Sequence, residues 1–185
     1  MEKGTYGYGI RKLKMQILKM SACYALVIGA FVIGLILTGT RKNILTVGAI
    51  CSVLPAATFT VNVIARLKGL PLKKQDYEKF EKAAEGQVTA CDMIVTANQK
   101  LVPIQAAVFH EHGITAYTAS KKTDLKQAER DLNGLSKSVG IYAKIRLFGD
   151  FEAFLKQTGS IQEPENEEKK EELRQKRKAF LVYSM

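Results

Sequence analysis

The fold is decided by two uncharged stretches, MSACYALVIGAFVIGLILTGT (Met20–Thr40) and NILTVGAICSVLPAATFTVNVIA (Asn43–Ala65). Neither stretch contains Asp, Glu, Lys, Arg or His. An α-helix rises about 1.5 Å per residue, so about 20 residues cross a hydrocarbon core of about 30 Å. The loop between the stretches is so short that the two helices must be antiparallel neighbours. We therefore expect residues 20–66 to form a two-helix transmembrane hairpin.

Positive charge is concentrated beside this hairpin. The first 74 residues contain eleven Lys or Arg and one acid, Glu2, whereas the remaining residues are neutral overall. Cytoplasmic flanks of membrane helices carry the excess of Lys and Arg, so we predict a two-pass protein of the cell membrane with both termini in the cytoplasm. The expected partners are the lipid bilayer and its anionic headgroups. The cations predicted to contact this surface are Arg11, Lys12, Lys14, Lys19, Arg66, Lys68, Lys73 and Lys74.

The composition suggests that the rest of the chain divides into a basic start, a linker, one small domain and a tail. Tyr6 and Tyr8 alternate with glycines, which indicates a flexible start. The domain has no recognisable nucleic-acid signature and no net charge, so nucleic acid is not an expected partner. The predicted parts are a basic cytoplasmic N-terminal segment (1–19), the hairpin (20–66), a linker (67–75), a cytoplasmic α+β domain (76–160) and a charged helical tail with an apolar end (161–185).

Within the domain, short β-rich stretches are followed by alternating helix and strand patterns. Strands are predicted over residues 91–96, 101–109, 114–119 and 141–148, and helices over residues 76–85, 123–140 and 150–155. This order favours a mostly antiparallel sheet of about four strands with helices on one face. We expect Leu132, Leu135, Ile145 and Leu147 to share its core. The apolar C-terminal end (179–185) could pack on the domain, on the membrane or on a partner, and packing on the domain is favoured.

Few residues suggest catalytic chemistry. Two histidines two positions apart on a strand can share a metal, which makes His110-Glu111-His112 the best metal candidate. However, Gly113 indicates a turn there, and no third ligand is implied by the spacing. Asp92 is a candidate acid, and Cys91 is a nucleophile only if one of the histidines approaches it. We assign no catalytic, cofactor or metal residue and expect no cofactor.

Three functions remain open from the sequence. The leading hypothesis is a membrane-anchored cytoplasmic module that mediates protein–protein interaction or self-assembly. The alternative is an enzyme at the inner membrane surface, a hydrolase or metal-dependent enzyme, that uses Asp92, His110, Glu111 or His112. A further alternative is a small oligomeric membrane channel, which is weakened by the substantial folded domain that follows the hairpin.

Overall fold

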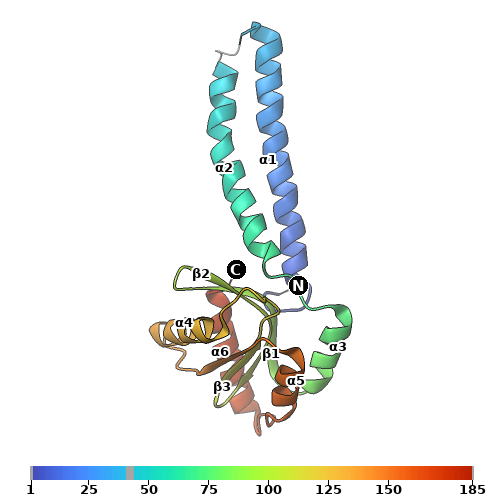
Figure 1. Cartoon of the computed structure of the whole chain (residues 1–185), viewed down its shortest axis with the longest axis vertical. Helices are drawn as coiled ribbons and strands as arrows, with labels where there is room; N and C mark the ends of the chain where they lie inside the picture. The colour runs from blue at the N-terminus through green and yellow to red at the C-terminus, as the bar shows by residue number, and fades with distance from the viewer. Residues whose placement is uncertain (1, 41–43, 185) are drawn as a thin grey trace. The chain divides into compact units, whose positions relative to one another are not determined.

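A computed structural model describes residues 2–40 and 44–184 (Figure 1). The chain divides into two compact units. The hairpin unit is Ile10–Leu67, and the sheet unit consists of the residues up to Gly9 together with those from Lys68 onward. The predicted outer loop, residues 41–43, lies outside the described residues.

The hairpin unit contains two long helices, α1 (Tyr8–Thr38) and α2 (Ile44–Leu67). Both are long and apolar enough to cross a membrane. The hydroxyl groups of Tyr24 in α1 and Thr60 in α2 are 3.1 Å apart, so the two helices contact each other at this level. Thr60 also donates to the carbonyl of Ala56, within its own helix, at 2.9 Å. The hairpin unit therefore satisfies these hydroxyl groups internally, as an apolar environment requires.

The sheet unit contains a four-stranded mixed sheet in the order β1-β2-β3-β4. The first three strands pair antiparallel, and the last two pair parallel. The strands are β1 (Val88–Ala97), β2 (Lys100–His110), β3 (Gly113–Tyr117) and β4 (Ile145–Phe148). The last strand is shorter than predicted because Tyr142, with φ at 49°, interrupts the extended backbone before it.

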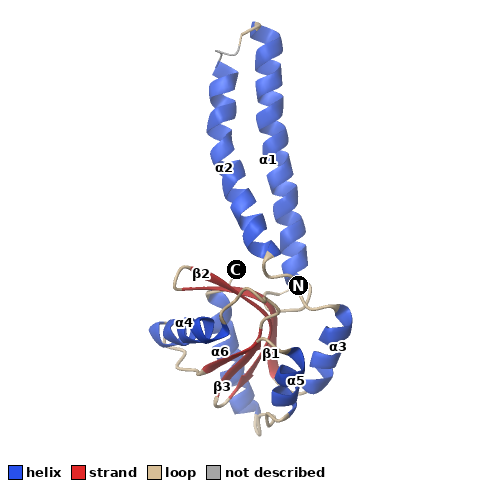
Figure 2. Cartoon of the chain, in the orientation of Figure 1, coloured by secondary structure: helices blue, strands red, loops and turns tan. Residues whose placement is uncertain are grey.

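Helices cover both faces of this sheet, which corrects the expectation of helices on one face (Figure 2). On one face lie α4 (Leu125–Ser138) and α6 (Glu167–Val182), and on the other lie α3 (Lys74–Ala83) and α5 (Phe151–Gly159). Strands that are buried on both sides need apolar residues in succession, and β2 is buried continuously from Val102 to Phe109. The shared core of Leu132, Leu135, Ile145 and Leu147 is confirmed.

The charged tail predicted over residues 161–185 is an integral part of the sheet unit. Helix α6 buries Leu173, Phe180 and Leu181 in the same core as β1 and β2. After the helix, Ser184 forms an antiparallel bridge with Val95 of β1. The apolar C-terminal end therefore packs on the domain, as favoured from the sequence.

Side chains of α4 close the outer edge of β4. Asn133 accepts a hydrogen bond from the N–H of Ile145 at 2.8 Å and donates to the carbonyl of the same residue at 2.9 Å. Glu129 accepts from the N–H of Leu147 at 3.1 Å. These groups take the place of a neighbouring strand, which protects the edge from pairing with another chain.

Candidate functional site: a polar kink in the first two strands

The first two strands change phase at the same level, at Asp92 and Gln105. In β1, every second residue faces the core at Val88 and Ala90, and the next expected core position is Asp92. The next residue in the core is instead Met93, so the alternation shifts by one residue. Asp92 has a φ of 55°, a left-handed conformation that Asp adopts more readily than most residues. The residues on either side of it remain paired with β2. We call Asp92 and Gln105 together the polar kink.

The carboxylate of Asp92 holds the segment that leads into α1. One of its oxygens, Oδ2, accepts hydrogen bonds from the N–H groups of Gly7 at 2.7 Å and Gly9 at 3.4 Å. The side chain is only 4% exposed, and within the described residues its Oδ1 has no hydrogen-bond partner. Burial raises the pKa of Asp92 to about 6, although the two glycine N–H groups act to lower it. Asp92 is therefore a buried acid that titrates near neutral pH.

The amide of Gln105 holds the segment that follows α2. Its Nε2 donates to the carbonyl of Leu70 at 3.2 Å, and its Oε1 accepts from the N–H of Ala119 at 2.9 Å. The hydroxyl of Tyr6 donates to the carbonyl of Leu72 at 3.1 Å, which ties the two segments to each other. The polar kink thus binds the chain on both sides of the hairpin unit. Sequence reasoning missed this function because Gln105 lies in an otherwise apolar strand.

The start of the chain is ordered by the same strand, which corrects the expectation of a flexible start. The carbonyl of Gly4 accepts from the N–H of Cys91 at 2.8 Å, so this part of the chain is attached to β1. The ring of Tyr6 stacks on that of Tyr77 in α3, with ring centroids 4.0 Å apart. Glycines at these positions allow the close approach, since a side-chain carbon at Gly9 would lie 3.3 Å from Cβ of Asp92.

The residues named for the alternative enzyme function are not all brought together. Asp92 lies at the level of Gln105 in β2, whereas His110 lies five residues further along that strand, roughly 16 Å away at 3.3 Å per residue. No group of three potential metal ligands occurs among residues 2–40 and 44–184. Cys91 is buried, and burial raises the pKa of its thiol to about 12, so it is protonated near neutral pH.

The turn formed by His110, Glu111 and His112, which we call the histidine turn, makes local contacts instead. Nε2 of His110 lies 3.1 Å from the hydroxyl of Thr115, and burial lowers the pKa of its imidazole, with His112 adding to the effect. The rings of His110 and His112 are 6.4 Å apart. Glu111 forms an ion pair at 2.8 Å with Lys169 of α6, and both side chains are exposed. These contacts describe a turn tied to α6.

The eight cations predicted to contact lipid differ in exposure. Arg66 is largely buried and Lys12 is half-buried, whereas the others are exposed. One of the exposed cations, Lys74, pairs weakly with Glu78 at 4.0 Å, and exposed pairs of this kind contribute little to stability. The exposed ammonium and guanidinium groups are those of Arg11, Lys14, Lys19, Lys68, Lys73 and Lys74.

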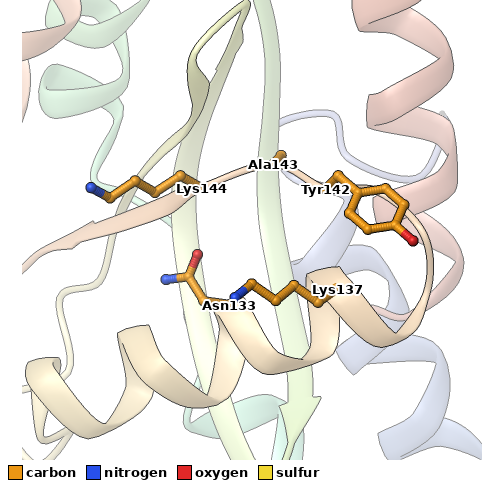
Figure 3. A pocket seen from close by; sticks show the side chains of 5 residues that line it. All are labelled: Asn133, Lys137, Tyr142, Ala143 and Lys144. Carbon is orange, nitrogen blue, oxygen red and sulfur yellow. The ribbon is translucent and has the colours of Figure 1, made fainter.

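A cavity of about 380 Å³ lies beside the C-terminal half of α4, lined by Asn133, Lys137, Tyr142, Ala143 and Lys144 (Figure 3). Lys137 extends toward Asn133, and the ring of Tyr142 lies on the other side of the cavity. The amide of Asn133 is already bonded to β4, and the lining contains two lysines and no carboxylate. The charge of these lysines favours an anion.

Comparisons of this chain with models of known protein families, with curated proteins and with solved structures found no match. By its fold, the chain is an α+β protein with a four-stranded mixed sheet and two long, apolar helices. Asp92 and Gln105 of the sheet bind backbone groups of Gly7 and Leu70, which precede and follow the hairpin unit in the sequence.

Proposed function

We propose that this chain is a membrane-anchored module that mediates protein–protein interaction or self-assembly. The observation that carries the proposal is the exposure of apolar side chains along both helices of the hairpin unit. Leu26, Ile36 and Leu54 are 72%, 75% and 74% exposed. Each such side chain contributes about 1.5–3 kcal/mol when it is removed from water, so these helices require an apolar cover. A lipid bilayer supplies that cover over the whole length of both helices.

The proposed orientation places both termini in the cytoplasm, at the cell membrane. Arg11, Lys14 and Lys19 precede the apolar part of α1, and Lys68 and Lys73 follow α2. Such cations are retained on the cytoplasmic side during insertion and add about 1 kcal/mol each near an anionic leaflet. The sheet unit, which contains residues from both sides of the hairpin, then lies in the cytoplasm.

A binding role for the sheet unit is favoured over catalysis by the separation of the candidate residues. An enzyme that used Asp92 together with His110, Glu111 or His112 would need the polar kink and the histidine turn within reach of one substrate. The kink and the turn lie at different levels of β2. In addition, the carboxylate of Asp92 is occupied by the N–H groups of Gly7 and Gly9.

Membrane insertion is tested with one charged substitution and a matched control. Leu54→Arg places a cation in the middle of α2, which should cost about 3 kcal/mol in a bilayer and reduce the carbonate-resistant fraction of the protein. Gln175→Arg adds the same charge to an exposed position of α6 and should leave that fraction unchanged. Complete removal of the unsubstituted chain from vesicles by carbonate would reject the anchor.

Topology and assembly need separate measurements. In a variant whose native cysteines are replaced, a cysteine placed by Thr40→Cys should react with an impermeant maleimide in intact cells. The Ser160→Cys variant should react only after permeabilisation. Cross-linking in native membranes should yield homo-oligomer or partner bands that depend on the sheet unit. Monomers alone, at every cross-linker length, would contradict the interaction role and leave only the anchor.

A further inference from the structure

The sheet unit exposes few large apolar side chains, and most of them gather at one end of the sheet. In the described part of this unit, the large apolar residues with substantial exposure are Leu70 (52%), Tyr142 (83%), Val182 (72%) and Tyr183 (44%). A single exposed apolar residue needs no explanation, but a contiguous group usually marks a contact surface. Leu70, Val182 and Tyr183 all lie beside the same part of β1, at Ile94 and Val95.

Leu70 is positioned by the middle of the β1–β2 hairpin. Its carbonyl accepts the hydrogen bond from Gln105. The preceding residue, Gly69, lies so close to Ile94 that a side-chain carbon would approach Cγ1 of Ile94 to 2.6 Å. The same position lies near Pro103, which pairs with Ile94 across the two strands. The segment of Gly69 and Leu70 is therefore fixed against Ile94.

Val182 and Tyr183 are positioned by Val95, the residue of β1 that follows Ile94. Ser184 bridges Val95, so the end of α6 lies along the outer edge of β1 at this level. Phe180 and Leu181 are buried in the core, which leaves Val182 and Tyr183 directed to solvent. Because Ile94 and Val95 are consecutive, Leu70 and the end of α6 flank one short piece of β1.

The chemistry of this corner matches a membrane interface. The ammonium group of Lys3 donates to the carbonyl of Ser184, and Lys68 and Lys73 are exposed on the linker beside Leu70. Tyrosine and lysine combine an apolar body with a polar end and are favoured at the headgroup level. Helix α2 ends at Leu67, three residues before Leu70, so the chain connects them over at most about 11 Å.

We propose that Leu70, Val182 and Tyr183 form a lipid-contacting patch that inserts at the headgroup level of an anionic bilayer, with Lys68 and Lys73 binding the phosphates around it. This inference rests on the proposed membrane anchor and adds a second attachment, made by the sheet unit itself. Three half-inserted side chains and two cations would hold this end of the sheet against the surface and restrict the orientations that a partner meets.

The experiment uses the absence of tryptophan from the chain. Val182→Trp introduces a single tryptophan into the patch, and Tyr142→Trp introduces one at an exposed control position. Tyr142 lies just before β4. The first residue of β4, Ile145, pairs with Ile114 of β3, and Ile114 pairs with Phe109 of β2. Phe109 is seven residues along β2 from Val102, which pairs with Val95, so the control lies roughly 23 Å from the patch along the sheet.

Both full-length variants are reconstituted into phosphatidylcholine–phosphatidylglycerol vesicles that contain lipids brominated near the headgroup. The Val182→Trp variant should emit at shorter wavelength and lose more than about half of its intensity to the brominated lipid, as an interfacial residue does. The Tyr142→Trp variant should be quenched by aqueous iodide and not by the lipid. Tyr183→Trp repeats the measurement if circular dichroism shows that Val182→Trp perturbs the fold.

The two proposals fail in different ways. If carbonate releases the unsubstituted chain from these vesicles, the membrane anchor is wrong and the patch is wrong with it. If the chain resists carbonate but iodide quenches the Val182→Trp and Tyr183→Trp variants as strongly as the Tyr142→Trp variant, the anchor stands and the patch is overturned.

Discussion

Replacing Asp92 with asparagine should stabilise the sheet unit at neutral pH and destabilise it in acid. The carboxylate of Asp92 is buried and accepts two backbone N–H groups through one oxygen, while its other oxygen has no partner in the described residues. Asparagine is nearly the same size and tolerates a left-handed backbone equally well, so the φ of 55° remains accessible. The substitution therefore removes the charge and leaves the geometry in place.

The magnitude follows from the pKa. Burial raises the pKa of Asp92 from 3.8 to about 6, so the ionised form costs the folded state about 3 kcal/mol above pH 6. A raised carboxyl pKa makes the stability contribution greatest below pH 3.8, and this contribution is lost as pH rises to about 6. Asparagine abolishes this loss, but its amide N–H₂ group gains no partner, a cost of about 1–2 kcal/mol. We expect a net gain of about 1–2 kcal/mol at pH 7 and a net loss of similar size at pH 4.

The measurement is hydrogen exchange of the full-length protein in lipid nanodiscs at several pH values, corrected for intrinsic exchange. The opening free energy of residues 4–9 and of β1 gives the effect of the substitution where it acts. Asp150→Asn is the matched control, because Asp150 also accepts a backbone N–H, from Ala153 at 3.1 Å, but in an exposed helix cap. Asn and Asp cap helices about equally, so this control should change stability by less than about 0.5 kcal/mol.

The decisive quantity is the difference between Asp92→Asn and the unsubstituted protein, because His110 titrates in the same range with the opposite sign. Burial lowers the pKa of His110, so its contribution is present above its ordinary pKa of 6.5 and is lost as pH falls. The effect of Asp92→Asn should change by about 2.4 kcal/mol between pH 4 and pH 7. An effect that is constant over this range would refute the assignment of a raised pKa to Asp92.

Four further substitutions test the packing of the sheet unit. Asn133→Ala removes both hydrogen bonds to Ile145 and should lower the free energy of unfolding by about 2 kcal/mol, measured by urea denaturation monitored by circular dichroism. Gly113→Ala should destabilise the protein by more than about 2 kcal/mol, because its new carbon would lie 2.1 Å from the carbonyl oxygen of Lys144. Gly134→Ala, at an open position of a helix, should instead stabilise the protein by up to about 1 kcal/mol. Equal effects of the two substitutions in thermal melts would contradict this geometry. Phe154→Ala empties the centre of an aromatic cluster and should cost about 3–5 kcal/mol, which pulse proteolysis can measure; a loss below about 1 kcal/mol would mean that the cluster is not closely packed.

Much of the secondary structure was predictable because its signals are local. The α5 helix begins after Asp150, as its capping residue indicates, and Ile145 and Leu147 face the core as their alternation predicts. Helix α4 begins at Leu125, two residues after the predicted start at residue 123, because the side chain of Asp124 accepts the capping hydrogen bond from the N–H of Gln127. The sequence also contained a signal that helices cover both faces of the sheet. From Val102 to Phe109, β2 has almost no alternation of apolar and polar residues, which is typical of a strand buried on both sides.

By itself, the sequence determined the two long apolar helices, the charge beside them and most strands and caps, because these depend on residues within a few positions of one another. Only the tertiary structure decided that Asp92 and Gln105 hold the segments on either side of the hairpin, and that α6 completes the core. The contact between Gly7 and Asp92, for example, joins residues 85 positions apart. These contacts depend on a shift in the alternation of β1 and β2. They also depend on buried polar side chains whose hydrogen-bond partners are backbone groups far away in the sequence. Neither feature produces a periodic pattern of apolar residues in the sequence.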